Sequence, residues 1–150
     1  MANFLVDSQI SQGSSFANSI SVPASTTPAL FGTLGLNTAG AGDDLRVHFS
    51  ATVTLAATIA ILVPVTITIV RVIGGVSTTV YTATESLPVG NLLLTTSVFT
   101  VSGVDVPPDD ANFIFYRAFV SIPAGLAVIP NRVGPESFQA VAYSDTPALD

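Results

Sequence analysis

The sequence predicts an all-β protein: a single antiparallel β-sandwich of jelly-roll type, with about eight strands and an extended N-terminal arm. Val, Ile and Thr supply 46 of the 150 residues, and these β-branched residues favour strands. Several segments alternate apolar and polar residues, whereas none sustains a helical period. Ten Pro and 11 Gly lie between the apolar runs, which is typical of short strands joined by turns in a sandwich or jelly roll.

Residues 1–28 are predicted to form an arm or connector, and residues 29–150 the jelly-roll domain. The first segment is rich in Ser and carries spaced apolar residues, among them Phe4, Leu5, Val6, Ile10 and Phe16. A floppy terminus would not need the run Phe4-Leu5-Val6. We therefore expect the arm to pair with an exposed sheet edge, either its own or that of a neighbouring copy.

The strands of the domain follow in order, separated by turn signals. Gly74-Gly75 is a two-residue hairpin signal, and Pro64 can break a long strand because proline cannot donate to a ladder. The expected strands are Ala29–Leu36, Leu45–Leu55, Ile59–Ile73 (one strand or two), Val76–Thr84, Leu92–Gly103, Ala111–Ile122 and Glu136–Ser144. The other turns are expected at Asn37–Asp44, Pro88–Asn91 and Val106–Asp110.

Three of these strands show which side chains face the core. Leu45–Leu55 alternates, with the odd-numbered residues apolar and predicted to point inward. Val63–Ile73 alternates in the same way, except that Arg71 falls in the apolar series. In Phe113–Ile122 both faces are apolar, and the second face carries Phe113, Phe115, Arg117 and Phe119. That face must be covered either inside the domain or by another subunit.

The composition excludes several classes of function. Only 14 residues are charged, 10 acidic and 4 Arg, with no Lys, so nucleic-acid binding is not expected. The stretch Phe49–Val70 has 22 uncharged residues and could span a bilayer by length, but its alternation, its five Thr and Pro64 predict strands. We expect no membrane partner. The N-terminus has no basic start and only a short apolar run, so it does not resemble a signal peptide.

No catalytic or cofactor chemistry is predicted, and we expect a non-enzyme without cofactor or metal. His48 is the single histidine and lies on the predicted polar face without a GxSxG motif or a cysteine nucleophile. The acid pairs Asp43-Asp44 and Asp109-Asp110 lack a calcium-loop pattern. The four arginines, each in or near an apolar run, fit either ion pairs across a subunit contact or exposed strand ends; they are Arg46, Arg71, Arg117 and Arg132.

The order of three segments resembles the small jelly-roll proteins of Bacillus and Clostridium spore surfaces. These segments are LGLNTAGAGDDLRVHFSATVTL (34–55), FTVSGVDVPP (99–108) and FQAVAYSD (138–145). The family includes endospore-appendage (Ena-type) fibre subunits and the tip domains of exosporium collagen-like proteins. The resemblance implies a fibre subunit whose N-terminal connector docks into a neighbour. The chain has no Cys, unlike the best-known appendage connectors, so the fibre that the resemblance implies is non-covalent or belongs to a different subtype.

The leading hypothesis is therefore a structural subunit that self-assembles into a spore-surface or cell-surface fibre through arm docking and β-strand addition. Its partners would be copies of itself and an anchoring protein on the spore surface. The predicted subunit interface comprises Phe4, Leu5, Val6, Ile10, Phe16, Phe113, Phe115, Arg117 and Phe119. The alternatives are a trimeric binding module, as in a spore tip or phage spike, that recognises carbohydrate or a receptor, and a virus capsid protein. The lack of a basic arm counts against the capsid.

Overall fold

The computed structural model describes residues 3–58, 62–87 and 94–146, and this part of the chain contains strands and turns but no helix. The predicted class, an all-β antiparallel sandwich, is confirmed. The predicted loop Pro88–Asn91 and the predicted strand starts at 59–61 and 92–93 lie outside the described residues. The strands are β1 (Phe4–Ser14), β2 (Val22–Pro23), β3 (Ala29–Asn37), β4 (Arg46–Thr58), β5 (Val63–Ile73), β6 (Val76–Leu87), β7 (Leu94–Asp105), β8 (Phe113–Ser121), β9 (Asn131–Arg132) and β10 (Glu136–Ser144).

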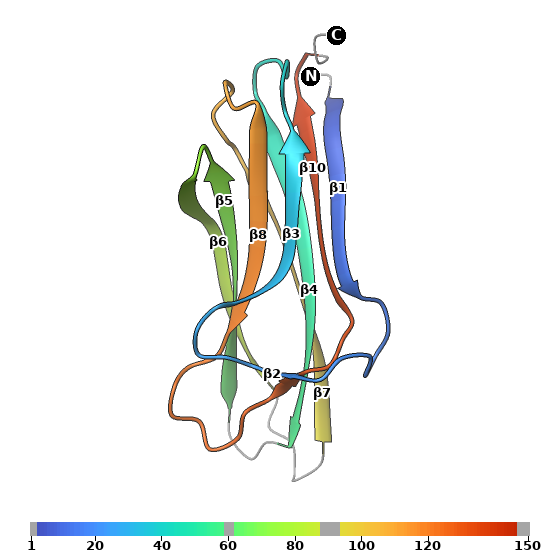
Figure 1. Cartoon of the computed structure of the whole chain (residues 1–150), viewed down its shortest axis with the longest axis vertical. Helices are drawn as coiled ribbons and strands as arrows, with labels where there is room; N and C mark the ends of the chain where they lie inside the picture. Colours follow the sequence, from blue (N-terminus) through green and yellow to red (C-terminus); the bar gives the residue numbers. More distant parts are fainter. Residues whose placement is uncertain (1–2, 59–61, 88–93, 147–150) are drawn as a thin grey trace.

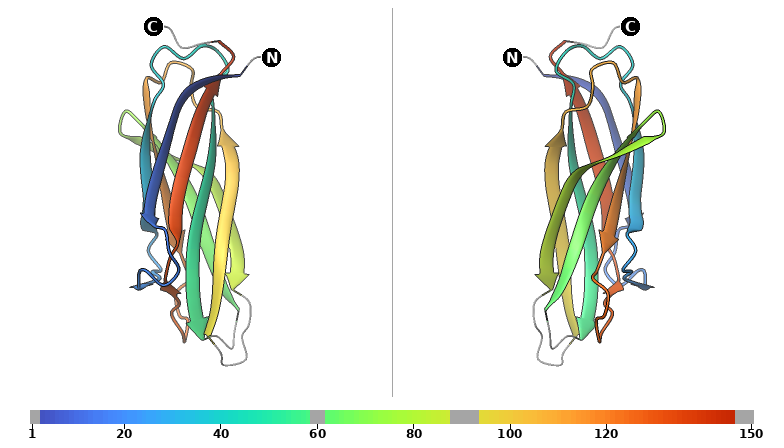
Figure 2. Two further views of the ribbon diagram at one scale, coloured as in Figure 1. Left: turned by 90° about the vertical axis from the view of Figure 1, so that its right-hand side faces the viewer. Right: turned by 90° about the vertical axis from the view of Figure 1, so that its left-hand side faces the viewer.

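Two antiparallel sheets form the sandwich (Figure 1). The first, here called the β4 sheet, runs β1-β10-β4-β7, and the short strands β9 and β2 continue from the lower part of β4. The left panel of Figure 2 shows these four long strands side by side. The second, the β8 sheet, runs β3-β8-β5-β6. Its two edge strands are therefore β3 and β6, while β1 and β7 are the edges of the β4 sheet.

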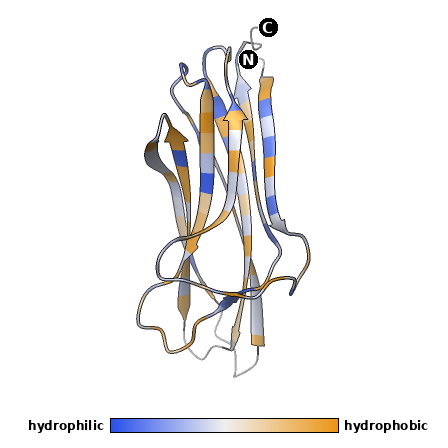
Figure 3. Cartoon of the chain, viewed as in Figure 1, coloured by the Kyte–Doolittle hydropathy of each residue, from blue (hydrophilic) through white to orange (hydrophobic). Residues whose placement is uncertain are grey.

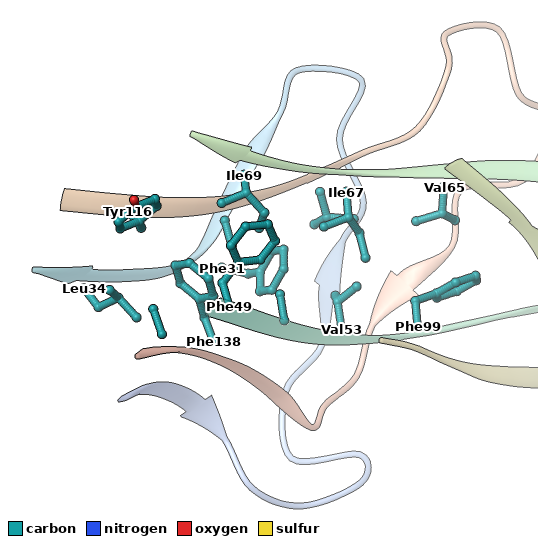
Figure 4. Close-up of a cluster of buried hydrophobic side chains, with 14 of the residues drawn as sticks. Phe31, Leu34, Phe49, Val53, Val65, Ile67, Ile69, Phe99, Tyr116 and Phe138 are labelled. Atoms are coloured by element: carbon teal, nitrogen blue, oxygen red, sulfur yellow. The ribbon is translucent and has the colours of Figure 1, made fainter. Parts of the chain in front are cut away.

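The core lies between the sheets and follows the predicted alternation. In β4 the residues Val47, Phe49 and Val53 are almost fully buried, and so are Val65 and Ile67 in β5. Figure 4 shows Phe49 and Val53 of β4 meeting side chains of β5 across the two sheets. Alternation places successive side chains on opposite faces of a strand, so the sequence pattern was sufficient to identify this core.

One departure from alternation has a local cause. Thr54 belongs to the outward series of β4 but is buried, and its hydroxyl donates to the Pro135 carbonyl at 3.0 Å.

The predicted Gly74-Gly75 hairpin joins β5 to β6, and both glycines have positive φ, 55° and 80°. A two-residue turn with two positive φ values matches the twist of the strands that it joins.

The predicted N-terminal arm is folded onto its own domain. Phe4–Ser14 forms β1 and pairs with β10 from Phe4↔Ser144 to Ser14↔Glu136. The sequence allowed the arm to pair either with its own sheet or with that of a neighbouring copy, and the structure shows the first of these. The segment is thus an edge strand of the sandwich, and not a free extension in the described chain.

Side chains of β1 also close one side of the sandwich. The Asn37 amide donates to Asp7 Oδ2 at 2.8 Å, and the Thr33 amide donates to Ser11 Oγ at 3.2 Å. These donors belong to β3, the neighbouring edge of the other sheet, and would otherwise be free to pair with another chain. These two amides on the edge of β3 are therefore satisfied within the molecule.

Candidate functional site

The predicted interface residues fall into two groups on different parts of the surface. Phe4, Leu5, Ile10 and Phe16 are exposed by 38%, 62%, 67% and 75%, while Val6 is half-buried against the core. Phe113, Phe115, Arg117 and Phe119 lie on the outer face of β8. The structure does not bring the two groups into one site, because β1 belongs to the β4 sheet and β8 to the other.

The outer face of β8 is not covered by the rest of the described chain. Phe113 and Phe115 are 47% and 46% exposed, and Leu30, on the neighbouring strand β3 and opposite Phe119, is 47% exposed. Burial of this face inside the domain, one of the two possibilities left by the sequence, is therefore excluded. Figure 3 shows hydrophobic colouring over much of β8, interrupted by a hydrophilic band. We call Leu30, Phe113, Phe115, Arg117 and Phe119 the β8 patch.

A glycine gives the upper part of the β8 patch its shape. Phe113 and Phe115 pack edge to face, with ring centroids 4.9 Å apart. Both rings lie against Gly35 of β3, where an added Cβ would meet the Phe113 ring at 2.8 Å and the Phe115 ring at 3.2 Å. Aromatic rings that cover a glycine on a neighbouring strand hold each other in place, so this part of the patch is preformed.

The opposite side of the sandwich is open. β6 pairs only with β5, and β7 only with β4, so within the described residues each has a free backbone edge. The right panel of Figure 2 views this side. A groove of about 360 Å³ runs between the two strands and is lined by Val65, Ile67, Tyr81, Ala83, Thr84, Glu85, Phe99, Thr100, Val101 and Ser102. We call it the β6–β7 groove.

The amino-acid sequence contains a partial signal for this open side. β6 and β7 contain 12 residues each, without Lys or Pro, and their only charges are Glu85 and Asp105. Such strands lack the usual guards against edge pairing. Their position at the sheet edges depends on the pairing order, which local sequence does not encode, so sequence reasoning missed the groove and its residue Glu85.

Three of the four arginines are paired inside the chain. Arg46 contacts Asp145 at 3.0 Å, Arg71 contacts Asp105 at 2.9 Å, and Arg132 contacts Glu136 at 2.6 Å. For these three, the expectation of subunit pairing or an exposed strand end was wrong. The Arg117 side chain is exposed and makes no hydrogen bond or ion pair with any residue that the structure describes.

Arg71, the exception in the apolar series of β5, belongs to a buried polar network. Its Nη1 donates to both carboxylate oxygens of Asp105 at 2.9 Å, and the Tyr116 hydroxyl donates to Asp105 Oδ2 at 2.7 Å. Burial, together with this hydrogen bond, raises the pKa of the Tyr116 phenol far above its ordinary value. The network satisfies the polar atoms inside the sandwich, so we assign it a structural role.

The residues considered for catalysis or metal binding are exposed. The exposed His48 ring packs edge to face on Tyr143 at 5.3 Å. A hydrogen bond with Asp145 and the negative charge of that residue raise the pKa of Asp44, whereas hydrogen bonds from Asp44 and Arg46 lower that of Asp145. Over the three described ranges, no group of three or more His, Asp or Glu is placed to hold a metal ion.

A shallow hollow lies on the outer face of the β4 sheet beside His48. It measures about 660 Å³ and is lined by Asn3, Arg46, His48, Val104 and Tyr143. Arg46 is held there by Asp145, the Asp44 carbonyl and Asn3 Oδ1. Its size and its polar and aromatic lining fall within the range of small-molecule sites.

In comparisons with known proteins, no protein-family model matches the chain, and no curated protein is detectably similar to it. Across residues 3–58, 62–87 and 94–146 there is also no helix of the length and hydrophobicity needed to cross a membrane.

Proposed function

We propose that the protein is a structural subunit that assembles with copies of itself into a non-covalent fibre by β-strand addition. The observation that carries the proposal is the open side of the sandwich, where two long edge strands without Lys or Pro border a groove of mixed polar and apolar lining. Long, unguarded edges of this kind template pairing with another chain.

Addition of β7 of one copy to β6 of the next is a contact that repeats from copy to copy. Each copy then uses β6 towards one neighbour and β7 towards the other, which is a heterologous contact and propagates as a filament when the rotation does not close a ring. A ladder of about six hydrogen bonds at a net 0.5–1.5 kcal/mol each would supply roughly 3–9 kcal/mol before the cost of association. Burial of neighbouring apolar side chains adds to this value.

The strand order supports assignment of the sandwich to the jelly-roll type. The first and last long strands, β1 and β10, lie side by side in the β4 sheet, and β3 and β8 lie side by side in the other. The chain thus winds from the outer pairs towards the central hairpin β5–β6. Together with the resemblance to spore-surface jelly-roll subunits, this winding favours a fibre on the spore or cell surface, held there by an anchoring protein.

Arm docking into a neighbour is the weaker part of the proposal, because β1 already completes its own sheet. A matched pair of variants separates the two modes of assembly. Val98 on β7 and Ile10 on β1 are both exposed on the outer face of the β4 sheet, by 60% and 67%. We expect Val98→Lys to abolish fibres in negative-stain electron microscopy and Ile10→Lys to preserve them, since Lys on an edge strand opposes pairing.

The reverse result, in which Ile10→Lys forms no fibres and Val98→Lys still forms them, would assign assembly to the N-terminal strand. Purified wild-type protein that keeps one fixed mass by light scattering would contradict the fibre, and a mass of three copies would indicate the closed trimer instead.

A binding module is the second candidate, and the hollow beside His48 favours it. Tyr143 offers a ring face, and Arg46 and Asn3 offer hydrogen-bond groups, which is a suitable lining for a sugar ring. Titration with N-acetylglucosamine, followed through the His48 ring signals by NMR, tests this function. A saturable shift that is lost in Tyr143→Ala would support it, and unchanged spectra at millimolar sugar would exclude this ligand.

A further inference from the structure

The β6–β7 groove is lined by one charged side chain, and that charge is unpaired. Glu85 of β6 lies opposite the buried Val65 of β5, so its side chain is on the inner side of the sheet, which borders the groove. Glu85 is exposed and makes no hydrogen bond or ion pair with any residue that the structure describes. The other described residues that line the groove are uncharged, so a single carboxylate stands beside an open strand edge.

The groove is closed at one end and has an apolar floor. Tyr81 of β6 packs edge to face on Phe49, with ring centroids 5.4 Å apart, and an added Cβ at Gly103 of β7 would meet the Tyr81 ring at 3.1 Å. Tyr81 thus bridges the two sheets. Beyond it, Val65 and Phe99 face each other across the sandwich (Figure 4) and both line the groove. The site therefore combines apolar surface, a backbone edge and one carboxylate.

A strand that added to β6 beside this groove would use all three features. Its backbone would pair with the edge, and every second side chain would point to the inner side, over the apolar floor. One of these side chains would lie next to Glu85, because side chains directly opposite each other on paired strands are only about 4.5–5.5 Å apart. Opposite charges at such a position stabilise a strand pair and like charges destabilise it, so Glu85 favours a strand that carries Arg or Lys there.

The chain itself does not supply such a strand. It contains four Arg and no Lys, and Arg46, Arg71 and Arg132 are held by internal ion pairs. Arg117 belongs to β8, which is paired on both sides, with β3 and β5, and so cannot add to an edge. β7, the strand that adds in the proposed fibre, carries no basic residue. An Arg or Lys opposite Glu85 must therefore come from a different protein.

We propose that the β6 edge beside Glu85 is the docking site for an extended basic segment of a second kind of protein, whose apolar side chains enter the groove and whose Arg or Lys pairs with the carboxylate. The inference deepens the proposed fibre function and rests on it for its location. Copies inside the fibre use β6 for a neighbour, so this edge is free only in the copy at one end. The anchoring protein would hold that copy, and the fibre would leave the surface from its β6 end.

Two synthetic peptides test the charge pairing. Both alternate Thr with Val, and one Val near the end is replaced by Arg in the first peptide and by Glu in the second. The protein is the Val98→Lys variant, which should stay unassembled and keep β6 unchanged, because Val98 lies on the outer face of β7 in the other sheet. NMR shifts of the β6 amides give each affinity. We expect the Arg peptide to bind at least fivefold more tightly than the Glu peptide, equivalent to about 1 kcal/mol.

Charge reversal on the protein supplies the control. In the same background, Glu85→Arg should invert the preference, so that the Glu peptide binds more tightly. Asp110→Arg makes the same change of net charge at an exposed acid outside the groove, and it should keep the preference for the Arg peptide. Inversion by both variants would overturn the contact, since net charge alone would then explain the effect. Circular dichroism of each variant checks that it is folded.

The remaining results separate this site from the function on which it rests. Equal affinities for the two peptides, no binding of either at millimolar concentration, or shifts that lie away from β6 would overturn the basic-strand site and leave the fibre standing. Val98→Lys protein that still forms fibres would overturn strand addition through β7. A preference for the Arg peptide that Glu85→Arg inverts would still support the groove contact in that case.

Discussion

The ion pair between Arg132 and Glu136 gives the strongest stability prediction. Arg132 Nε and Nη2 donate to the two oxygens of Glu136, both at 2.6 Å, and the side chains are only 9% and 5% exposed. The pair lies where β9 and β10 join the β4 sheet. Glu136→Ala would leave the guanidinium buried without a counter-charge.

The expected cost follows from that burial. Removing one partner of a buried, hydrogen-bonded ion pair costs about 3–5 kcal/mol. For a domain of this length each kcal/mol lowers Tm by about 2–4 °C, so Glu136→Ala should melt roughly 6–20 °C below wild type. Urea unfolding followed by circular dichroism measures the same loss as a lower midpoint with an unchanged slope.

The control replaces both partners at once. Arg132→Met with Glu136→Leu removes both charges and keeps most of the side-chain volume, so its unfolding free energy should lie within about 1–2 kcal/mol of wild type or above it, since desolvation of the pair offsets much of its attraction. A double variant as unstable as Glu136→Ala would refute this reasoning, because the cost would then arise from lost packing and not from an unpaired charge. A Glu136→Ala variant as stable as wild type would refute the burial argument itself.

Three further predictions concern the core and the N-terminal strand. Tyr116→Phe should lower the unfolding free energy by about 1.5–3 kcal/mol at pH 8, because it removes a hydrogen bond to a charged group. The folded state raises the pKa of this phenol above its ordinary 10.0, so its contribution to stability is complete below pH 10 and shrinks as the pH rises. Urea unfolding should therefore show a smaller difference between wild type and variant at pH 11 than at pH 8. Gly32→Ala places a Cβ 2.5 Å from Phe138 Cβ and should cost about 1–3 kcal/mol by overpacking; an unchanged thermal melt would show that β3 can shift there. Deletion of residues 1–24 should lower Tm and cause aggregation, because it uncovers the edges of β10 and β3; a soluble deletion variant with the wild-type Tm would show that β1 adds no stability.

The N-terminal segment shows where sequence reasoning stops. Its spaced apolar residues correctly indicated a strand that pairs with the edge of a sheet. They did not indicate which edge, because Leu5 and Ile10 remain exposed on the outer face even after pairing. The edge with which β1 pairs is determined by its ladder with β10 and by Asp7 and Ser11, whose side chains accept hydrogen bonds from backbone amides of β3. Such contacts join residues more than 20 positions apart and leave no local periodic signal.

The arginines show the same limit for the candidate site. The sequence placed Arg71 among inward residues without explaining it, and the explanation is Asp105 on the facing sheet, with Tyr116 beside it. Arg117 has the same apolar surroundings in sequence yet faces outward. Only the assembled sheets distinguish a charge that is paired in the interior from one that remains available on the surface.

The sequence by itself determined the fold class, the strands and their inward faces, because these depend on β-branched content, a period of two and turn residues, all of which are local. It also determined that few charged side chains are present on the surface to oppose pairing with another chain. The tertiary structure alone decided which strands became edges, that one side of the sandwich is closed by β1 and the other left open at β6 and β7, and that the phenylalanines of β8 face solvent. These features depend on pairing between distant segments, and a strand pattern is compatible with many pairing orders.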